Sequence, residues 1–117
     1  MPPPSSLTIA TSALQRLVKE EKSYHKELQQ QEERVRKLES EKADADEDHE
    51  FKLRQERRAV EETKAVFPSL RARIKEALEK LQGQLEAEKE GEGASVEEIT
   101  KAKEAVMEGT TALREVA

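Results

Sequence analysis

Few side chains in this sequence have the types and spacing that chemistry needs. His25 and His49 are its two histidines, and they lie far apart along the chain. Asp46, Asp48 and His49 together offer the oxygen and nitrogen donors of a metal site. The same three residues suit an exposed acidic helix start, because carboxylates favour the positive end of the helix dipole. We adopt the second interpretation and expect neither a metal nor another cofactor. His25 is expected to pack half-exposed beside the apolar seam.

Motifs of known enzyme classes are missing as well. The sequence has no cysteine, which excludes disulfides and thiolate metal sites. It contains no glycine-rich phosphate loop, no nucleophile elbow and no zinc-type spacing. Nothing supplies a nucleophile and a base in one pocket. We therefore expect a protein that is not an enzyme.

The composition limits the fold to one small domain with a narrow core. Of 117 residues, 40% are charged and 3% are aromatic. Such a chain is either a disordered polyampholyte or a set of long helices with a narrow apolar seam. We expect no signal peptide, because the first residues lack its basic and apolar regions, and no membrane span, because no apolar run approaches the roughly 20 residues that one needs. We expect a soluble cytoplasmic protein without membrane contact.

Charge is distributed unevenly along the chain. The net charge is −5, but residues 52–75 carry 8 Lys and Arg against 3 Asp and Glu. Overall acidity argues against nucleic acid as the main partner. The basic middle segment either binds an acidic protein or only solvates helix surfaces.

Heptads identify the first helix. One apolar row repeats every seven residues at Leu7, Leu14, Glu21, Leu28 and Val35. A second row lies three residues further on, at Ala10, Leu17, Tyr24, Gln31 and Leu38. Eight of these ten positions are apolar, which is typical of a coiled-coil seam. The stripes favour helices over disorder.

A second stripe follows an acidic break in which Asp44 or Asp46 is expected to cap the next helix. It carries Leu53, Val60, Phe67, Ile74 and Leu81, with a companion row at Glu56, Thr63, Leu70, Ala77 and Gln84. Pro68 lies inside this stripe, and a proline normally stops or bends a helix. Because the stripe continues in register, we expect a helix that is kinked outward at Pro68 and not broken.

A third helix is expected after a charged, glycine-containing linker at residues 86–94. Ser95 and Glu98 predict a capping box at its start. Behind it lies a shorter stripe at Ile99, Ala102, Val106, Leu113 and Val116. Gly109 falls on this stripe and is expected to weaken it.

Short linkers between long helices place neighbouring helices antiparallel. The sequence therefore predicts an all-α fold, an antiparallel up-down-up three-helix bundle with coiled-coil-like heptad packing. We expect one domain over residues 1–117, with a frayed tail at 1–5. The helices are expected at about 6–42, about 47–87 and about 95–116.

Several seam positions are polar, namely Glu21, Gln31, Glu56, Thr63 and Gln84. Buried polar groups cost stability unless they are hydrogen-bonded, although they can fix the register of helices. These residues either pair between helices or mark a shallow seam that meets solvent or a partner. We favour internal pairing or side chains that reach out to water.

The first two helices resemble the tubulin-binding cofactor A family. Residues 9–20 read IATSALQRLVKE, and YHKE (24–27) and QQEE (30–33) follow at the family's spacing. The second helix adds ETKAVFP at 62–68, with Leu70 and residues 78–81 behind it. The match covers most of residues 9–85. A proline-rich tail, a more charged first linker and the third helix depart from the family pattern.

The resemblance implies a three-helix bundle that binds β-tubulin after its release from the cytosolic chaperonin. It implies that the chain holds the quasi-native subunit and passes it to downstream tubulin-folding cofactors that assemble the α/β heterodimer. A cytoskeleton-associated cytoplasmic location follows, and no nucleotide or metal is implied. A homodimer remains open, because a heptad stripe can be satisfied within one chain or between two.

Contacts with tubulin should come from outward positions, since the seam is used by the bundle. The candidates are polar residues of the first two helices: Lys19, Lys22, Lys26, Gln30, Glu33, Arg54, Arg57 and Arg58. The arginines complement an acidic tubulin surface.

Two other interpretations remain. A structural coiled-coil subunit of a larger scaffold would show the same heptads without chaperone activity. A prefoldin-like chaperone would need β-hairpins between its helices, and neither linker alternates in hydropathy as strands do.

Overall fold

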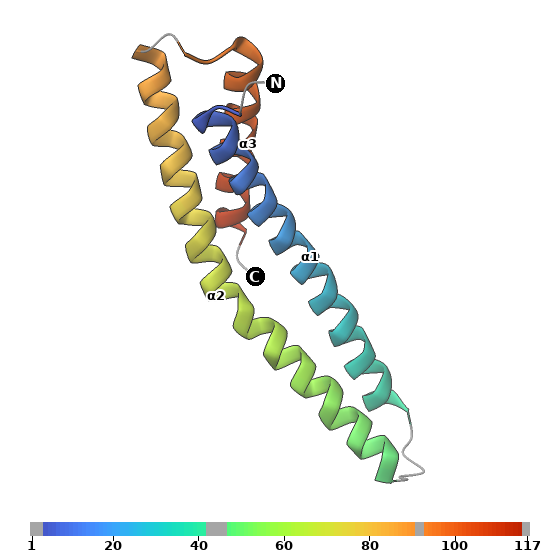
Figure 1. Ribbon diagram of the computed structural model, residues 1–117. Helices are drawn as coiled ribbons and strands as arrows, with labels where there is room; N and C mark the ends of the chain where they lie inside the picture. Colours follow the sequence, from blue (N-terminus) through green and yellow to red (C-terminus); the bar gives the residue numbers. More distant parts are fainter. Residues whose placement is uncertain (1–3, 42–46, 91–92, 116–117) are drawn as a thin grey trace. The chain divides into compact units, whose positions relative to one another are not determined.

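The computed structural model describes residues 4–41, 47–90 and 93–115, and every secondary-structure element within these residues is an α-helix (Figure 1). Helix α1 is Ser6–Ser40, α2 is Glu47–Glu90 and α3 is Val96–Arg114. The all-α class expected from the heptads is confirmed. None of the described helices is long and apolar enough to cross a membrane.

The helix ends differ from the expected bounds at the linkers. Helix α2 continues to Glu90, so the first part of the expected 86–94 linker is helical. Pro68 lies inside α2, which therefore is not broken there. A kink at this residue stays a prediction. The capping candidates Asp44 and Asp46, and most of the expected frayed tail, lie outside the described residues.

The chain divides into two compact units. The first, which we call the three-helix unit, combines Met1–Glu21 with Ser69–Ala117. The second, the two-helix unit, is Lys22–Pro68. Each unit has its own helix contacts and its own pattern of burial. The expectation of a single domain stays a prediction.

In the three-helix unit, side-chain contacts set the helix directions. Ser5 and Thr8 at the start of α1 donate hydrogen bonds to Glu98 at the start of α3. Arg71 of α2 instead reaches the end of α3, at the carbonyl of Leu113. Helices α1 and α3 therefore run parallel, with α2 antiparallel to both (Figure 1). This arrangement confirms the up-down-up order.

The core of the three-helix unit follows the heptads. Its fully buried large side chains are Leu7, Leu14, Ile74 and Leu81. Each such residue contributes roughly 1.5–3 kcal/mol through burial of apolar surface. Helix α3 contributes only small buried residues, at Ala102, Ala105, Gly109 and Ala112. Small side chains let its backbone approach the other two helices closely.

Gly109 marks that close approach. A Cβ atom at this position would lie 3.2 Å from both terminal methyl groups of Leu14 and 3.4 Å from a methyl group of Leu78. The sequence suggested that Gly109 weakens the stripe of α3. In the structure its missing side chain leaves room for two core leucines, and the weakening of the stripe stays a prediction.

In the two-helix unit, the end of α1 pairs with the start of α2. Ion pairs join Arg34 to Glu56 at 3.3 Å and Arg57 to Glu39 at 3.1 Å. The seam here is less buried than in the three-helix unit, because only two helices cover it. Val60 and Phe67 are buried, whereas the remaining large aliphatic seam residues are half-buried: Leu28, Val35, Leu38 and Leu53.

Polar seam residues pair internally, as the sequence analysis favoured. The buried Thr63 hydroxyl donates to Oε1 of buried Gln31 at 2.7 Å. Glu21, whose side chain is 4% exposed, accepts from Arg71 at 3.3 Å. Gln84 differs, because its buried Oε1 has no hydrogen-bond partner within the part of the chain that the structure describes.

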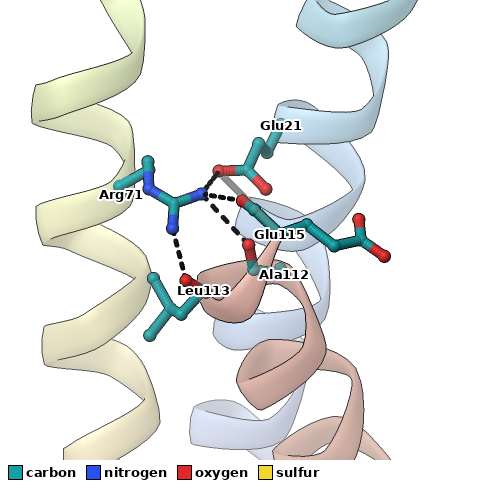
Figure 2. A network of polar contacts seen from close by, with 5 residues as sticks. All are labelled: Glu21, Arg71, Ala112, Leu113 and Glu115. Atoms are coloured by element: carbon teal, nitrogen blue, oxygen red, sulfur yellow. Dashed lines mark hydrogen bonds and ion pairs between the residues drawn. The ribbon is translucent and has the colours of Figure 1, made fainter. Parts of the chain in front are cut away.

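Arg71 joins all three helices of the three-helix unit (Figure 2). Besides Glu21 of α1, its guanidinium donates to three carbonyls at the end of α3, those of Ala112, Leu113 and Glu115, at 2.5–3.1 Å. The last carbonyls of a helix lack intrahelical partners and carry its negative dipole end. One arginine therefore caps α3 and neutralises a buried carboxylate. We call this network the Arg71 clasp.

The opposite end of the three-helix unit is fixed by the capping box. Ser95 accepts from the backbone N–H of Glu98 at 3.2 Å, and the Glu98 carboxylate accepts from the Ser95 N–H at 3.3 Å. The box expected from sequence is confirmed. Hydrogen bonds from Ser5, then from the backbone of Ser95 and from Thr8, hold the pKa of Glu98 below its ordinary value.

Candidate partner-binding surface

The imagined metal site gains no support from the described residues. No group of three or more acidic, histidine or cysteine side chains there is arranged to hold a metal ion. His49 faces Glu41 at 4.0 Å, and Asp46 lies outside the described residues. His25 is half-buried and stacks on Phe67 with ring centroids 4.5 Å apart, as a packing residue would.

All eight residues selected from sequence as partner contacts are exposed: Lys19, Lys22, Lys26, Gln30, Glu33, Arg54, Arg57 and Arg58. Lys19 belongs to the three-helix unit and the other seven to the two-helix unit. The four from Lys22 to Glu33 recur at helical spacing and so share one face of α1. They form a polar stripe that the helix pairing does not use.

The three arginines of α2 do not share one environment. Arg57 bonds to Glu39 across the hairpin and so flanks the seam. Arg54 and Arg58 lie on the outer face, where together with Phe51 and Gln55 they line a shallow pocket of about 270 Å³. Arg57 therefore differs from Arg54 and Arg58 in its partner, and it does not line this pocket.

Phe51 is the residue of this surface that the sequence analysis missed. Its side chain is 55% exposed, which is unusual for one of only two phenylalanines in a chain with so few aromatics. The signal was present in the heptads, because Phe51 falls two residues before Leu53 and off both seam rows. An aromatic residue off the seam of a long amphipathic helix faces outward.

A second concave region lies in the two-helix unit, between α1 and α2. Its floor is formed by Val35 and Val60, and its rim is charged, with Glu32, Arg36, Glu39, Arg57 and Glu61. The Arg57–Glu39 pair closes part of this rim. The groove therefore mixes charges of both signs, unlike the pocket around Phe51.

Comparison with known protein families gives one extensive match. Residues 2–106 match the family described as tubulin binding cofactor A. The tubulin-specific chaperone A of Mus musculus is 32% identical over 88 residues, which are 75% of this chain and 77% of the relative. The protein of the same name from Saccharomyces cerevisiae is 35% identical over 79 residues, covering 68% of this chain and 71% of the relative.

Two solved structures share the fold. The tubulin folding cofactor A of Arabidopsis thaliana superposes with a TM-score of 0.76 at 28% identity, over 90% of this chain and 92% of that one. A β-tubulin-binding post-chaperonin cofactor gives a TM-score of 0.80 at 31% identity, over 95% of this chain and the whole of that one. Both comparisons extend over all three helices.

Proposed function

The chain belongs to the tubulin binding cofactor A family, and on this premise we propose that it is a tubulin-folding cofactor that captures and holds quasi-native β-tubulin after chaperonin release. One observation carries the partner assignment. A solved cofactor whose whole length matches 95% of this chain, at 31% identity, is described as binding β-tubulin. The held subunit would then be available for assembly of the α/β heterodimer.

The proposed activity is binding without catalysis. Long helices with a polar outer face and a seam used for internal packing provide exposed side chains for a partner. The same proposal places the chain in the cytoplasm, associated with the cytoskeleton, and passes β-tubulin to further folding cofactors. It includes no nucleotide, metal, nucleic acid or membrane. Sedimentation equilibrium distinguishes a single chain from a homodimer.

The contact surface we propose consists of the eight exposed polar residues on α1 and α2. Its sharpest test is reversal of charge at Arg54, Arg57 and Arg58 to glutamate. Exposed positions tolerate such changes, so the helical circular dichroism signal should be retained while capture of β-tubulin weakens. Capture of β-tubulin that is unchanged at low salt, where electrostatic attraction is least screened, would show that the arginines are not part of the contact surface.

The function itself is tested with β-tubulin newly released from the chaperonin. The purified chain should co-elute with it in gel filtration as a stable complex. Bovine serum albumin and unrelated chaperonin-released actin serve as controls for nonspecific capture. A structural coiled-coil subunit would leave β-tubulin uncomplexed and would associate instead with a heptad partner, and that result would refute the proposal.

A further inference from the structure

An exposed aromatic residue and two arginines occupy one face of α2. Phe51 is followed by Arg54, Gln55 and Arg58, at three, four and seven positions further along the helix. These intervals place side chains on the same helix face. The four residues line one shallow pocket, so their proximity does not rest on helical spacing alone.

The charge of this face is available to a ligand. Arg54 has no hydrogen bond or ion pair within the described part of the chain. Arg58 pairs with Glu62 at 3.6 Å, but both side chains are more than 70% exposed. Such exposed pairs contribute little and are readily exchanged for a better acceptor. Arg57, by contrast, is engaged with Glu39 at 3.1 Å.

Phe51 supplies the apolar part. Contact of an exposed phenylalanine ring with water is unfavourable. A partner side chain that covers the ring removes this apolar surface from water, which favours binding. Aromatic and arginine residues are enriched among the positions that dominate binding energies at interfaces. Arginine also binds carboxylates through two parallel hydrogen bonds, which lysine cannot do.

We propose that Phe51, Arg54 and Arg58 form a docking surface for an acidic segment that presents an apolar side chain flanked by carboxylates. The proposal rests on the proposed function, because it assigns that segment to the captured β-tubulin subunit. Charge complementarity supports this occupant, since residues 52–75 carry 8 Lys and Arg against 3 Asp and Glu. Within the contact surface proposed above, these three residues are expected to contribute most of the binding on α2, because Arg57 is engaged with Glu39.

Two variants and a matched control test the surface. Phe51→Ala removes the apolar anchor, and the double variant Arg54→Glu with Arg58→Glu reverses both charges. The control, Lys64→Glu with Arg73→Glu, makes the same total charge change on exposed residues of α2 outside the pocket and outside the proposed contact surface. Circular dichroism melting checks that each variant folds as the wild-type chain does.

The measurement is the dissociation constant for chaperonin-released β-tubulin at two salt concentrations. Phe51→Ala should weaken binding at least about tenfold. The Arg54/Arg58 variant should weaken it more and should lose most of the salt dependence, whereas the control should stay within about threefold of wild type. Equal effects of the two double variants would mean that only net charge matters, and this would overturn the proposal.

The remaining outcomes distinguish failure of the docking surface from failure of the proposed function. If wild type binds β-tubulin and Phe51→Ala binds equally well, the docking surface is refuted while the proposed function stands. If wild type does not bind, both fall. A second copy of this chain is the competing occupant, because residues 76–117 carry 11 Asp and Glu against 5 Lys and Arg. Self-association that Phe51→Ala abolishes, with β-tubulin binding unchanged, would assign the surface to that copy.

Discussion

Substitution of Arg71 by alanine tests whether one side chain holds the three-helix unit together. The change removes the four hydrogen bonds of the Arg71 clasp, one to Glu21 of α1 and three to the end of α3. It deletes no large apolar group from the core. We therefore expect a loss of stability that comes from polar contacts between helices and not from a cavity.

The size of this loss follows from two separate contributions. Hydrogen bonds to a charged group contribute about 1.5–3 kcal/mol each, and we use the lower end because the Arg71 side chain is 25% exposed. The contact with the buried Glu21 carboxylate then contributes about 1.5 kcal/mol. The cap on α3 contributes a similar amount, about 1.5 kcal/mol, through the carbonyls and the helix dipole. The free energy of unfolding should fall by about 3 kcal/mol, and the melting temperature by about 12 °C.

The assay is urea unfolding followed by circular dichroism, with Arg73→Ala as the matched control. Arg73 lies two residues away, is exposed and makes no hydrogen bond or ion pair within the described residues. The control should change stability by less than about 0.5 kcal/mol. Arg71→Lys should lie between wild type and alanine, because an ammonium group cannot span the acceptors as a guanidinium does. A loss below about 1 kcal/mol for Arg71→Ala would refute the clasp as a stabilising element.

Two further predictions concern the three-helix unit. Because the pKa of Glu98 is lowered in the folded state, its stabilising contribution is present above the ordinary value of 4.5 and is lost as pH falls through the folded pKa. Between pH 5 and pH 3, the free energy of unfolding in urea should fall less for Glu98→Gln than for wild type. An equal fall in both proteins would contradict this prediction. Gly109→Val should destabilise by about 1–3 kcal/mol through crowding, whereas Gly83→Ala, with open space around it, should stabilise by about 0.5–1 kcal/mol. Thermal melts of both variants check the signs.

Periodicity was sufficient to predict much of this fold. The heptad rows of α1 and α2 mark side chains that are buried or half-buried throughout, including the polar pair Gln31 and Thr63. The capping box at Ser95 was also predictable, because it depends on residues within one helical turn. Local spacing decides both features, so they can be derived without knowing which helices meet.

Features that depend on the third helix could not be derived in the same way. Arg71 looks like any surface arginine beside a seam, and its role appears only when the ends of α1 and α3 are brought to it. The buried Ala105 and Ala112 have side chains too small to stand out in a hydropathy pattern. The close packing around Gly109 could not be derived for the same reason, since it depends on Leu14 of α1 and Leu78 of α2.

The candidate surface was found only in part. Exposure of Arg54, Arg57 and Arg58 follows from their places off the seam, so sequence was enough to select them. Sequence could not tell that Arg57 turns to Glu39 while the other two share a pocket with Phe51. Rotamers and cross-helix partners decide this difference, and neither is encoded in spacing along one helix.

The two units also differ in how early the growing chain can form them. The hydrogen bonds between the helices of the two-helix unit join residues 18 to 32 positions apart, such as Arg57 with Glu39 and Thr63 with Gln31. Ser5 and Glu98, in the three-helix unit, are 93 positions apart. Closing the longer loop costs about 1.5 kcal/mol more in chain entropy than closing the shortest. During synthesis the two-helix unit can therefore assemble first, whereas the contacts between the first turns of α1 and α3 form only after α3 has left the ribosome.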